Sequence, residues 1–263
     1  FMPNITMDGL ALHYIELGPR AAPLNLLFIH GAASSLDVWT ITLPGLTEFH
    51  PIALDLPGHG RSKPPGRLSV EQYALIIERF ISALNLENVV LVGHSLGSAI
   101  ALTVAQRSLI PIRGLVLFGA SARMPVGDAL LGGSLTALES VAAFIAAQGI
   151  IDAPTDQRES VARQVLACGA TTTFGDFLAC NRFDLREKLS TLDVPTLVIA
   201  GRLDRMTPLR FSESLVGGLP QAQLFTLEGT GHFAMLERSE SIKPLMTSFL
   251  RDLASSEARR AGA

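Results

Sequence analysis

The segment Gly93-His94-Ser95-Leu96-Gly97 places a serine between two glycines, and that serine could act as a nucleophile. It directly follows an apolar run at residues 89–92 and directly precedes residues 98–107, which have helical periodicity. A tight strand-to-helix turn of this kind exposes the serine hydroxyl at a helix N-terminus, where backbone N–H groups favour negative charge. The pattern in this context therefore predicts that Ser95 is a catalytic nucleophile.

A serine nucleophile needs a general base, and six histidines compete for that role. His232 lies in a glycine-containing loop after the last expected strand, where the chain order serine, acid, histidine requires the base. The other five histidines are expected to do other things: His13 and His50 as solvated side chains, His30 and His59 as partners of backbone groups, and His94 pointing to the wrong side of the turn.

The acid that orients the histidine should lie at the end of a late strand. Asp204 follows the apolar residues 198–200 and would hold the imidazole in the right tautomer. The other usual place is after the strand at 114–118, but Gly119-Ala120-Ser121 contains no carboxylate. Asp204 is therefore the predicted acid.

Two backbone N–H groups are needed to bind the oxyanion of a tetrahedral intermediate. Leu96 supplies one because it directly follows the nucleophile. The loop His30-Gly31-Ala32-Ala33-Ser34 follows another expected strand, and its glycine lets the backbone approach a substrate closely. We expect the second group to be the N–H of Ala32, with Trp39 packing to fix this loop.

The elements that must position these residues alternate along the chain, which is typical of an α/β fold with a mostly parallel sheet and helices on both faces. Short apolar runs predict strands at residues 24–29, 51–54, 89–92, 114–118, 195–200 and 223–227. Helical periodicity predicts helices at 70–84, 98–107, 208–215 and 242–253. A hairpin over residues 4–16 begins the sheet antiparallel, residues 122–186 read as a helical insertion, and residues 255–263 as a frayed end.

Composition, charge and cysteine spacing limit the partners, compartment and metal sites that can be expected. The 263 residues carry a formal charge of −3, so nucleic acid is not an expected partner. The absence of a leader pattern and of an apolar run long enough for a membrane span makes the cytoplasm the expected compartment, and Phe1 reads as a cloning remnant. Cys168 and Cys180 lack metal-binding spacing and are expected to be buried thiols, although a disulfide between them stays open.

Four stretches together resemble the α/β-hydrolase superfamily: residues 30–34, 55–62, 93–97 and 229–232. The resemblance implies an eight-stranded sheet, with a core at 1–121 and 187–263 and a helical cap at 122–186 inserted after the sixth strand. It also implies that Asp55, His59 and Arg61 satisfy each other and nearby backbone. Within the superfamily the chain is similar to pimeloyl-ester carboxylesterases and enol-lactonases, and a nucleophilic serine argues against haloalkane dehalogenases and epoxide hydrolases.

The predicted reaction is hydrolysis of a small-molecule ester through an acyl-enzyme, which needs no metal and no organic cofactor. Apolar side chains expected to line an acyl pocket are Met124, Leu130, Phe144, Phe174, Phe177 and Phe233. Arg123, Asn181 and Arg182 could meet a substrate carboxylate or form a solvated face. Lactone or C–C bond hydrolysis would use the same three residues, and a hydrolase-like ligand receptor is a remote alternative. The chain is expected to be a monomer or a homodimer.

Overall fold

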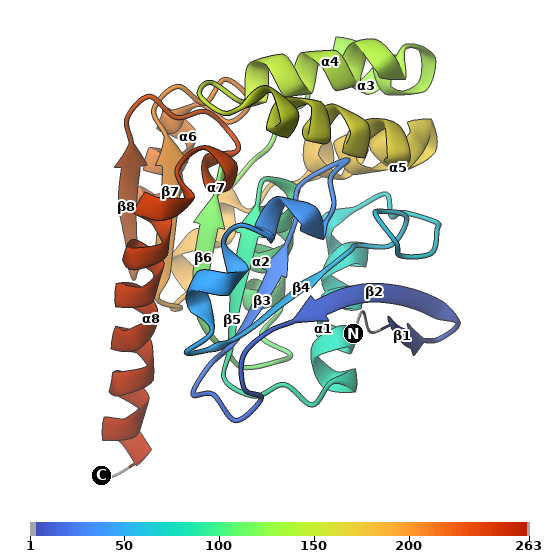
Figure 1. Cartoon of the computed structure of the whole chain (residues 1–263). Helices are drawn as coiled ribbons and strands as arrows, with labels where there is room; N and C mark the ends of the chain where they lie inside the picture. The colour runs from blue at the N-terminus through green and yellow to red at the C-terminus, as the bar shows by residue number, and fades with distance from the viewer. Residues whose placement is uncertain (1–3, 262–263) are drawn as a thin grey trace.

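An eight-stranded sheet forms the centre of residues 4–261, which the computed structural model describes, with side chains to Ser255 (Figure 1). The strands are β1 (Asn4–Met7), β2 (Leu10–Glu16), β3 (Asn25–Ile29), β4 (His50–Leu54), β5 (Val89–His94), β6 (Ile112–Phe118), β7 (Thr196–Gly201) and β8 (Ala222–Leu227). Every apolar run predicted to be a strand forms one. The interpretation of Phe1 lies outside the described residues.

The sheet is mostly parallel, in the order β1-β2-β4-β3-β5-β6-β7-β8. β1 pairs antiparallel with β2, and β2 antiparallel with β4, while all later pairs are parallel. Strands β3, β4, β5 and β7 are buried at every residue, as continuous apolar runs in parallel sheets should be. The predicted α/β fold with an antiparallel start is therefore confirmed.

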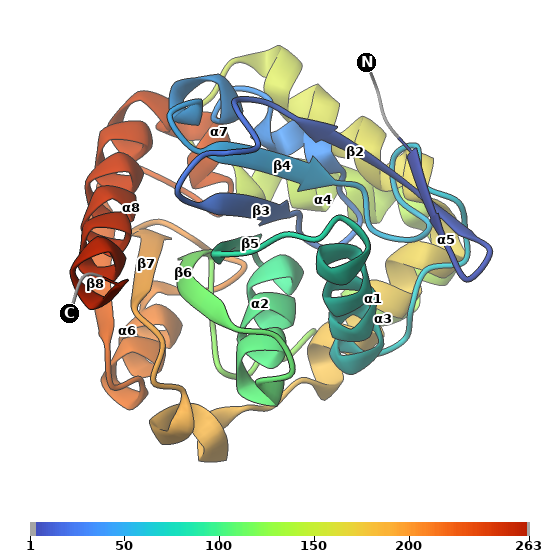
Figure 2. The same ribbon diagram turned by 90° about the horizontal axis from the view of Figure 1, so that it is seen from below.

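Helices cover both faces of this sheet (Figure 2). One face carries α1 (Val70–Ala83), α2 (Leu96–Arg107) and α6 (Leu209–Gly218), and the other carries α7 (Ala234–Glu237), α8 (Ser239–Ala261) and the 3-10 helices Leu36–Trp39 and Leu43–Leu46. A third 3-10 helix, Arg186–Thr191, precedes β7. The two apolar cores lie between the sheet and these layers, and they fix the ends of the parallel strands in space.

The chain end differs from the expectation of a frayed segment after residue 254. Helix α8 continues as a helix to Ala261. Alanine, glutamate and arginine are good helix formers, and extending an existing helix avoids the cost of nucleation. An apolar periodicity is thus not required there.

Three helices lie between β6 and β7 and sit over the carboxyl ends of the parallel strands (Figure 1). We call α3 (Asp128–Thr136), α4 (Leu138–Gly149) and α5 (Thr155–Arg182) the cap helices. The two ends of this insertion lie side by side, because Arg123 and Asp184 form a β-bridge and the Leu185 N–H donates to the Ala122 carbonyl. Helix α5 is broken at Gly169, whose φ of +75° suits glycine. The exact boundaries of a separate cap domain stay a prediction.

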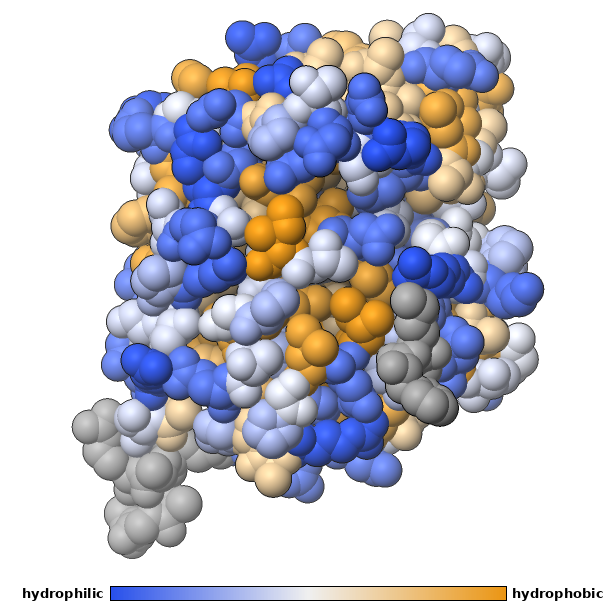
Figure 3. Space-filling view, viewed as in Figure 1, coloured by the Kyte–Doolittle hydropathy of each residue, from blue (hydrophilic) through white to orange (hydrophobic). Residues whose placement is uncertain are grey.

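On the face seen in Figure 3, small apolar patches are separated by hydrophilic side chains. No helix within the described residues is both long and apolar enough to cross a bilayer. Cys168 and Cys180 are free thiols, and Cys180 is buried while Cys168 is half-buried.

Candidate active site

Ser95 occupies the sharp turn between β5 and α2. Its φ of +52° and ψ of −116° are unusual for a residue with a side chain, and the Ser95 N–H donates to the Phe118 carbonyl at 2.9 Å. A Cβ on Gly93 would lie 2.6 Å from the carbonyl carbon of Gly97, and one on Gly97 would lie 2.7 Å from the His30 carbonyl oxygen. The glycines therefore let β5, α2 and the loop after β3 meet at the strained serine.

His232 is held by a buried carboxylate. The imidazole Nδ1 donates to Asp204 Oδ2 at 2.8 Å, and the Met206 and Thr207 N–H groups donate to Oδ1, each at 2.8 Å. Burial opposes ionisation of Asp204, but His232 and these hydrogen bonds outweigh it and lower the pKa of the carboxyl. Asp204 is thus an ionised acceptor that fixes the ring.

The loop that carries His232 is tied to the end of cap helix α4. The Gly149 carbonyl accepts hydrogen bonds from the N–H of His232 at 2.7 Å and of Phe233 at 3.2 Å. The buried Glu237 carboxylate accepts from the N–H groups of Gly231, Ile151 and Asp152. This role of Glu237 was not predictable from the sequence, because Gly231 and Ile151 are far apart in the chain.

Gly119 explains the lack of a carboxylate after β6. A Cβ at this position would lie 2.7 Å from Cε1 and 2.8 Å from Nδ1 of His232, and Gly119 has a φ of +52°. The imidazole therefore packs directly on the backbone here, and any side chain at residue 119 would displace it.

His94, next to Ser95 in the turn, contacts the loop that carries His232. Its Nε2 donates to the His232 carbonyl at 3.1 Å, and its ring centroid lies 4.6 Å from that of His232. Burial, helped by the nearby His232, lowers the pKa of His94 well below its usual range, so it is a neutral spacer rather than a base.

A cavity of about 240 Å³ opens between these residues and the cap. Ser95, His232 and Ala32 line its floor. The predicted pocket residues Met124, Leu130, Phe144 and Phe177 line the rest, together with Pro125, Val126, Gly127, Cys180, Arg205, Met206, Thr207 and Phe211. Among residues 4–261, no group of histidine, cysteine or carboxylate side chains is arranged to hold a metal ion.

The sequence model of the alpha/beta hydrolase family matches residues 26–242. The chain belongs to the alpha/beta hydrolase family. It is 31% identical over 201 residues to the pimeloyl-[acyl-carrier protein] methyl ester esterase of Sodalis glossinidius, a match that covers 70% of this chain and 77% of that protein.

Solved structures of hydrolases have the same fold. A thermophilic esterase superposes with a TM-score of 0.86 at 28% identity, over 96% of this chain and 98% of that one. The enol-lactonase of Burkholderia xenovorans superposes with a TM-score of 0.87, over 95% and 100% of the two chains, but at 20% identity it shows the fold alone. The family match and the two esterases at 31% and 28% identity support a hydrolase of the esterase or lactonase type.

Two predicted pocket residues of this hydrolase are not among those that line the cavity. Helix α5 reaches the cavity near its C-terminal end, at Phe177 and Cys180, and Phe174 lies one turn earlier. Phe233 is 4% exposed, and its ring packs 4.9 Å from that of His94. It therefore supports the histidine loop from within the core.

Arg205 is the arginine among the residues that line the cavity of this hydrolase. Arg123, Asn181 and Arg182 do not line the cavity, and Asn181 Oδ1 instead accepts from the Val126 N–H at 3.0 Å. Arg205 Nη1 donates to Gln148 at 2.9 Å. Its place beside Asp204 in the sequence was the signal that could have identified it.

The other histidines depart from the expectations in three cases. His13 and His50 are buried, at 2% and 1% exposure, and pair with Asn4 and Asn25. Their places in the first hairpin and in a surface-like connection had suggested solvated rings, but His13 lies in β2 and His50 in β4, where side chains of the neighbouring strands β1 and β3 contact them. His59 bonds not only to backbone but also to Asp176, which the sequence did not single out. Asp55 does accept from backbone N–H groups, as expected.

Proposed function

We propose that this alpha/beta hydrolase cleaves carboxylic esters of small to medium, largely apolar acyl groups through an acyl-enzyme, with Ser95 as nucleophile, His232 as general base and Asp204 as the orienting acid. The observation that carries the proposal is that a serine in a strained elbow shares one cavity with a histidine whose Nδ1 is 2.8 Å from a buried carboxylate. Nucleophile, base and orienting group are the parts that acyl transfer needs.

Acylation follows from this arrangement. Ser95 Oγ adds to the ester carbonyl carbon while His232 Nε2 takes the hydroxyl proton. The carbonyl oxygen becomes an oxyanion, to which the N–H groups of Ala32 and Leu96 donate. When the intermediate collapses, the C–O bond breaks and His232 returns its proton to the leaving alcohol, so that charge and protons balance.

Deacylation repeats these steps with water in place of the serine hydroxyl. His232 takes a proton from a water molecule, whose oxygen adds to the acyl carbon. The second oxyanion collapses, the bond to Ser95 Oγ breaks, and the serine regains a proton from His232. The ionised Asp204 stabilises the imidazolium in both half-reactions.

The size and lining of the cavity support the proposed acyl class. Its volume of about 240 Å³ lies below the range of about 300–1,000 Å³ that is common for sites of drug-sized ligands. Most of its side chains are apolar, and the cap supplies many of them, including Leu130, Phe144 and Phe177. Relatives that are named esterases agree with ester hydrolysis.

The decisive experiment measures hydrolysis of p-nitrophenyl esters of increasing acyl length, and of simple lactones, by wild type and by Ser95→Ala. We expect a preference for short to medium chains and a loss of kcat by at least about 10³-fold in the variant. Labelling with a fluorophosphonate should add one phosphonyl group to wild type, located at Ser95 by peptide mass spectrometry.

The control variant is Ser82→Ala. The Ser82 hydroxyl donates to the Glu78 carbonyl within its own helix α1. The variant should keep its rate and its label. Undiminished turnover in Ser95→Ala would reject the mechanism. Faster turnover of lactones than of esters would favour the lactonase alternative, and ligand binding without turnover would favour a receptor.

A further inference from the structure

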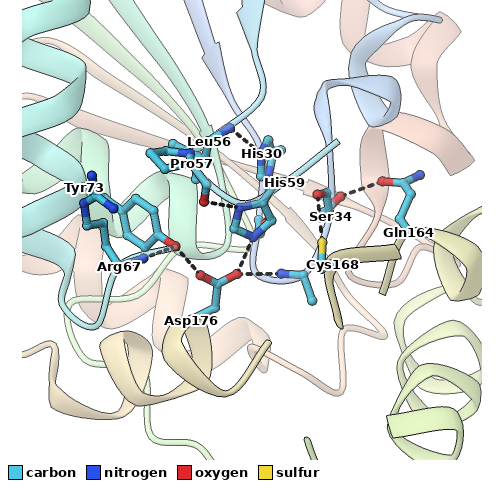
Figure 4. Close-up of polar contacts among 12 residues, drawn as sticks. His30, Ser34, Leu56, Pro57, His59, Arg67, Tyr73, Gln164, Cys168 and Asp176 are labelled. Atoms are coloured by element: carbon cyan, nitrogen blue, oxygen red, sulfur yellow. Dashed lines mark hydrogen bonds and ion pairs between the residues drawn. The ribbon is translucent and has the colours of Figure 1, made fainter. Parts of the chain in front are cut away.

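A second buried polar cluster joins cap helix α5 to the core (Figure 4). At its centre lies Asp176, whose side chain is 0% exposed. Oδ2 accepts from His59 Nε2 at 2.7 Å and from the Ala33 N–H at 2.8 Å, while Oδ1 accepts from the Tyr73 hydroxyl at 2.6 Å. One carboxylate of the cap thus ties together three segments of the core.

The pairing with Asp176 favours the charged form of His59. His59 Nδ1 lies 3.0 Å from the Pro57 carbonyl, so both ring nitrogens face acceptors and both donate. Burial opposes the charged ring, but Asp176 outweighs it and raises the pKa of His59. Hydrogen bonds with one charged partner, such as the His59 ring, are roughly twice as strong as neutral ones.

The Ala33 N–H connects this cluster to the loop that borders the cavity. Ala33 directly follows Ala32, which lines the cavity beside Ser95. Its φ of +50° is left-handed, a conformation that is unfavourable for a residue other than glycine. The hydrogen bond to Asp176 holds the backbone in that conformation.

The preceding peptide unit is fixed from the other side. His30 Nδ1 donates to the Gly31 carbonyl at 2.8 Å, and His30 Nε2 accepts from the Leu56 N–H at 3.0 Å. In a trans peptide the C=O and N–H point in opposite directions, so this bond aims the Ala32 N–H away from His30. Two successive peptide units around Ala32 are therefore anchored.

The first half of α5 contacts the same loop. Gln164 Oε1 accepts from the Ser34 hydroxyl at 3.0 Å, and Cys168 Sγ lies 3.6 Å from the Ser34 carbonyl oxygen (Figure 4). Gln164 Oε1 also accepts from the Ser35 hydroxyl at 3.1 Å. The loop after β3 is consequently bounded by α5 along residues 33–35.

We propose that Asp176 is a positioning residue for the oxyanion hole: through the Ala33 N–H it sets the direction of the Ala32 N–H, so that the cap helix determines how well the core stabilises the oxyanion. The inference rests on the proposed function. Asp176 itself touches no reacting atom, and its effect belongs to the transition state rather than to substrate binding.

The test compares wild type with Asp176→Ala on the best p-nitrophenyl ester and on a trifluoromethyl ketone of the same acyl length. Ser95 Oγ adds to that ketone, its proton passes to His232, and the ketone oxygen becomes an oxyanion. Removing one oxyanion donor costs about 10²–10³-fold in kcat, and misdirecting one should cost about 10–100-fold. We expect that loss in kcat, an equal rise in the inhibition constant of the ketone, and a KM within about threefold of wild type.

Tyr73→Phe is the matched control, because it removes a donor to the other oxygen of the same carboxylate. The Tyr73 hydroxyl also accepts from the Arg67 N–H, so this variant should lose thermal stability while its kcat stays within about threefold. Asp176→Asn keeps the side-chain volume but loses the charge, and its kcat should lie between those of wild type and Asp176→Ala.

Three results would overturn the inference. The first is an equal loss of kcat in Asp176→Ala and Tyr73→Phe. The others are a fall in kcat/KM of Asp176→Ala that comes from a higher KM, and an unchanged inhibition constant of the ketone. If Asp176→Ala does not fold, a kcat and inhibition constant of wild-type size in Asp176→Asn would overturn it. Failure of the proposed function is separate, because wild type itself would then neither hydrolyse the ester nor react with fluorophosphonate at Ser95.

Discussion

At the scale of single residues, the candidate site depends on close contacts that leave no room for change. Ser95 is strained, Gly119 lies against the imidazole, and Asp204 is surrounded by donors. Neighbours held in fixed positions in this way need to reorganise little when charge develops in the transition state. Substitutions here should therefore act on kcat more than on folding.

Gly119→Ala tests the contact with His232. The new Cβ would force the ring to move, and misplacement by about 1 Å can cost about 10²-fold in rate. We expect kcat to fall by about 10–100-fold. Gly9→Ala is the control, because Gly9 has a φ of +79° and nothing within 4 Å of a built Cβ. It should lower the melting temperature alone, and an equal kcat loss in both variants would contradict the argument.

Asp204→Asn tests the orienting acid. An amide in this position favours the wrong tautomer of His232, and kcat should fall by about 10³–10⁴-fold with little change in KM. Because the pKa of Asp204 is lowered from 3.8, the wild-type carboxylate stays ionised through the neutral range, and its contribution to stability disappears only as pH falls through the lowered value. A kcat loss below tenfold would reject Asp204 as the acid.

At the scale of elements, the short helix α7 connects the histidine loop with the cap. Glu237, its last residue, bonds to Gly231 before His232 and to Ile151 and Asp152 after α4. The histidine loop and the end of cap helix α4 thus share one buried acceptor. Movement of either element should disturb the other.

Glu237→Ala would leave three N–H groups without their acceptor. Since one buried unsatisfied group costs about 1–3 kcal/mol, we expect a loss of at least about 2 kcal/mol, or roughly 4–8 °C in melting temperature, with a lower kcat. Calorimetry and ester kinetics measure both. Glu240→Ala removes an exposed partner of Lys243 and should change neither. Equal melting temperatures of wild type and Glu237→Ala would disprove this role.

At the scale of the whole molecule, the His59–Asp176 pair links cap to core and should make stability depend on pH. The raised pKa of His59 means that its contribution is fully present below its ordinary value of 6.5 and is lost as pH rises through the raised value. Asp176 and Asp55 favour the charged ring, and His30, with a pKa of about 3, is neutral beside it.

Thermal unfolding of wild type and His59→Gln from pH 5.5 to 9 measures this linkage. The wild type should have a higher melting temperature than the variant, and the difference should be largest below about pH 6.5 and should shrink as pH rises. His13→Gln, in a buried ring whose pKa is lowered by burial, is the control and should not show this trend. A constant difference over the whole range would exclude an ionised His59.

The succession of strands and helices, the serine elbow, and the chain order of Ser95, Asp204 and His232 could all be read from the amino-acid sequence. These features are local, because apolar periodicity and glycine-bounded turns depend on neighbouring residues. The contacts between distant groups were visible only in the folded chain. His59 meets Asp176, 117 residues away, Glu237 meets the end of α4, and Arg205 lines the cavity while Phe174 and Phe233 do not. Burial and hydrogen-bond partners depend on how the cap packs on the core, and a one-dimensional pattern does not contain that packing.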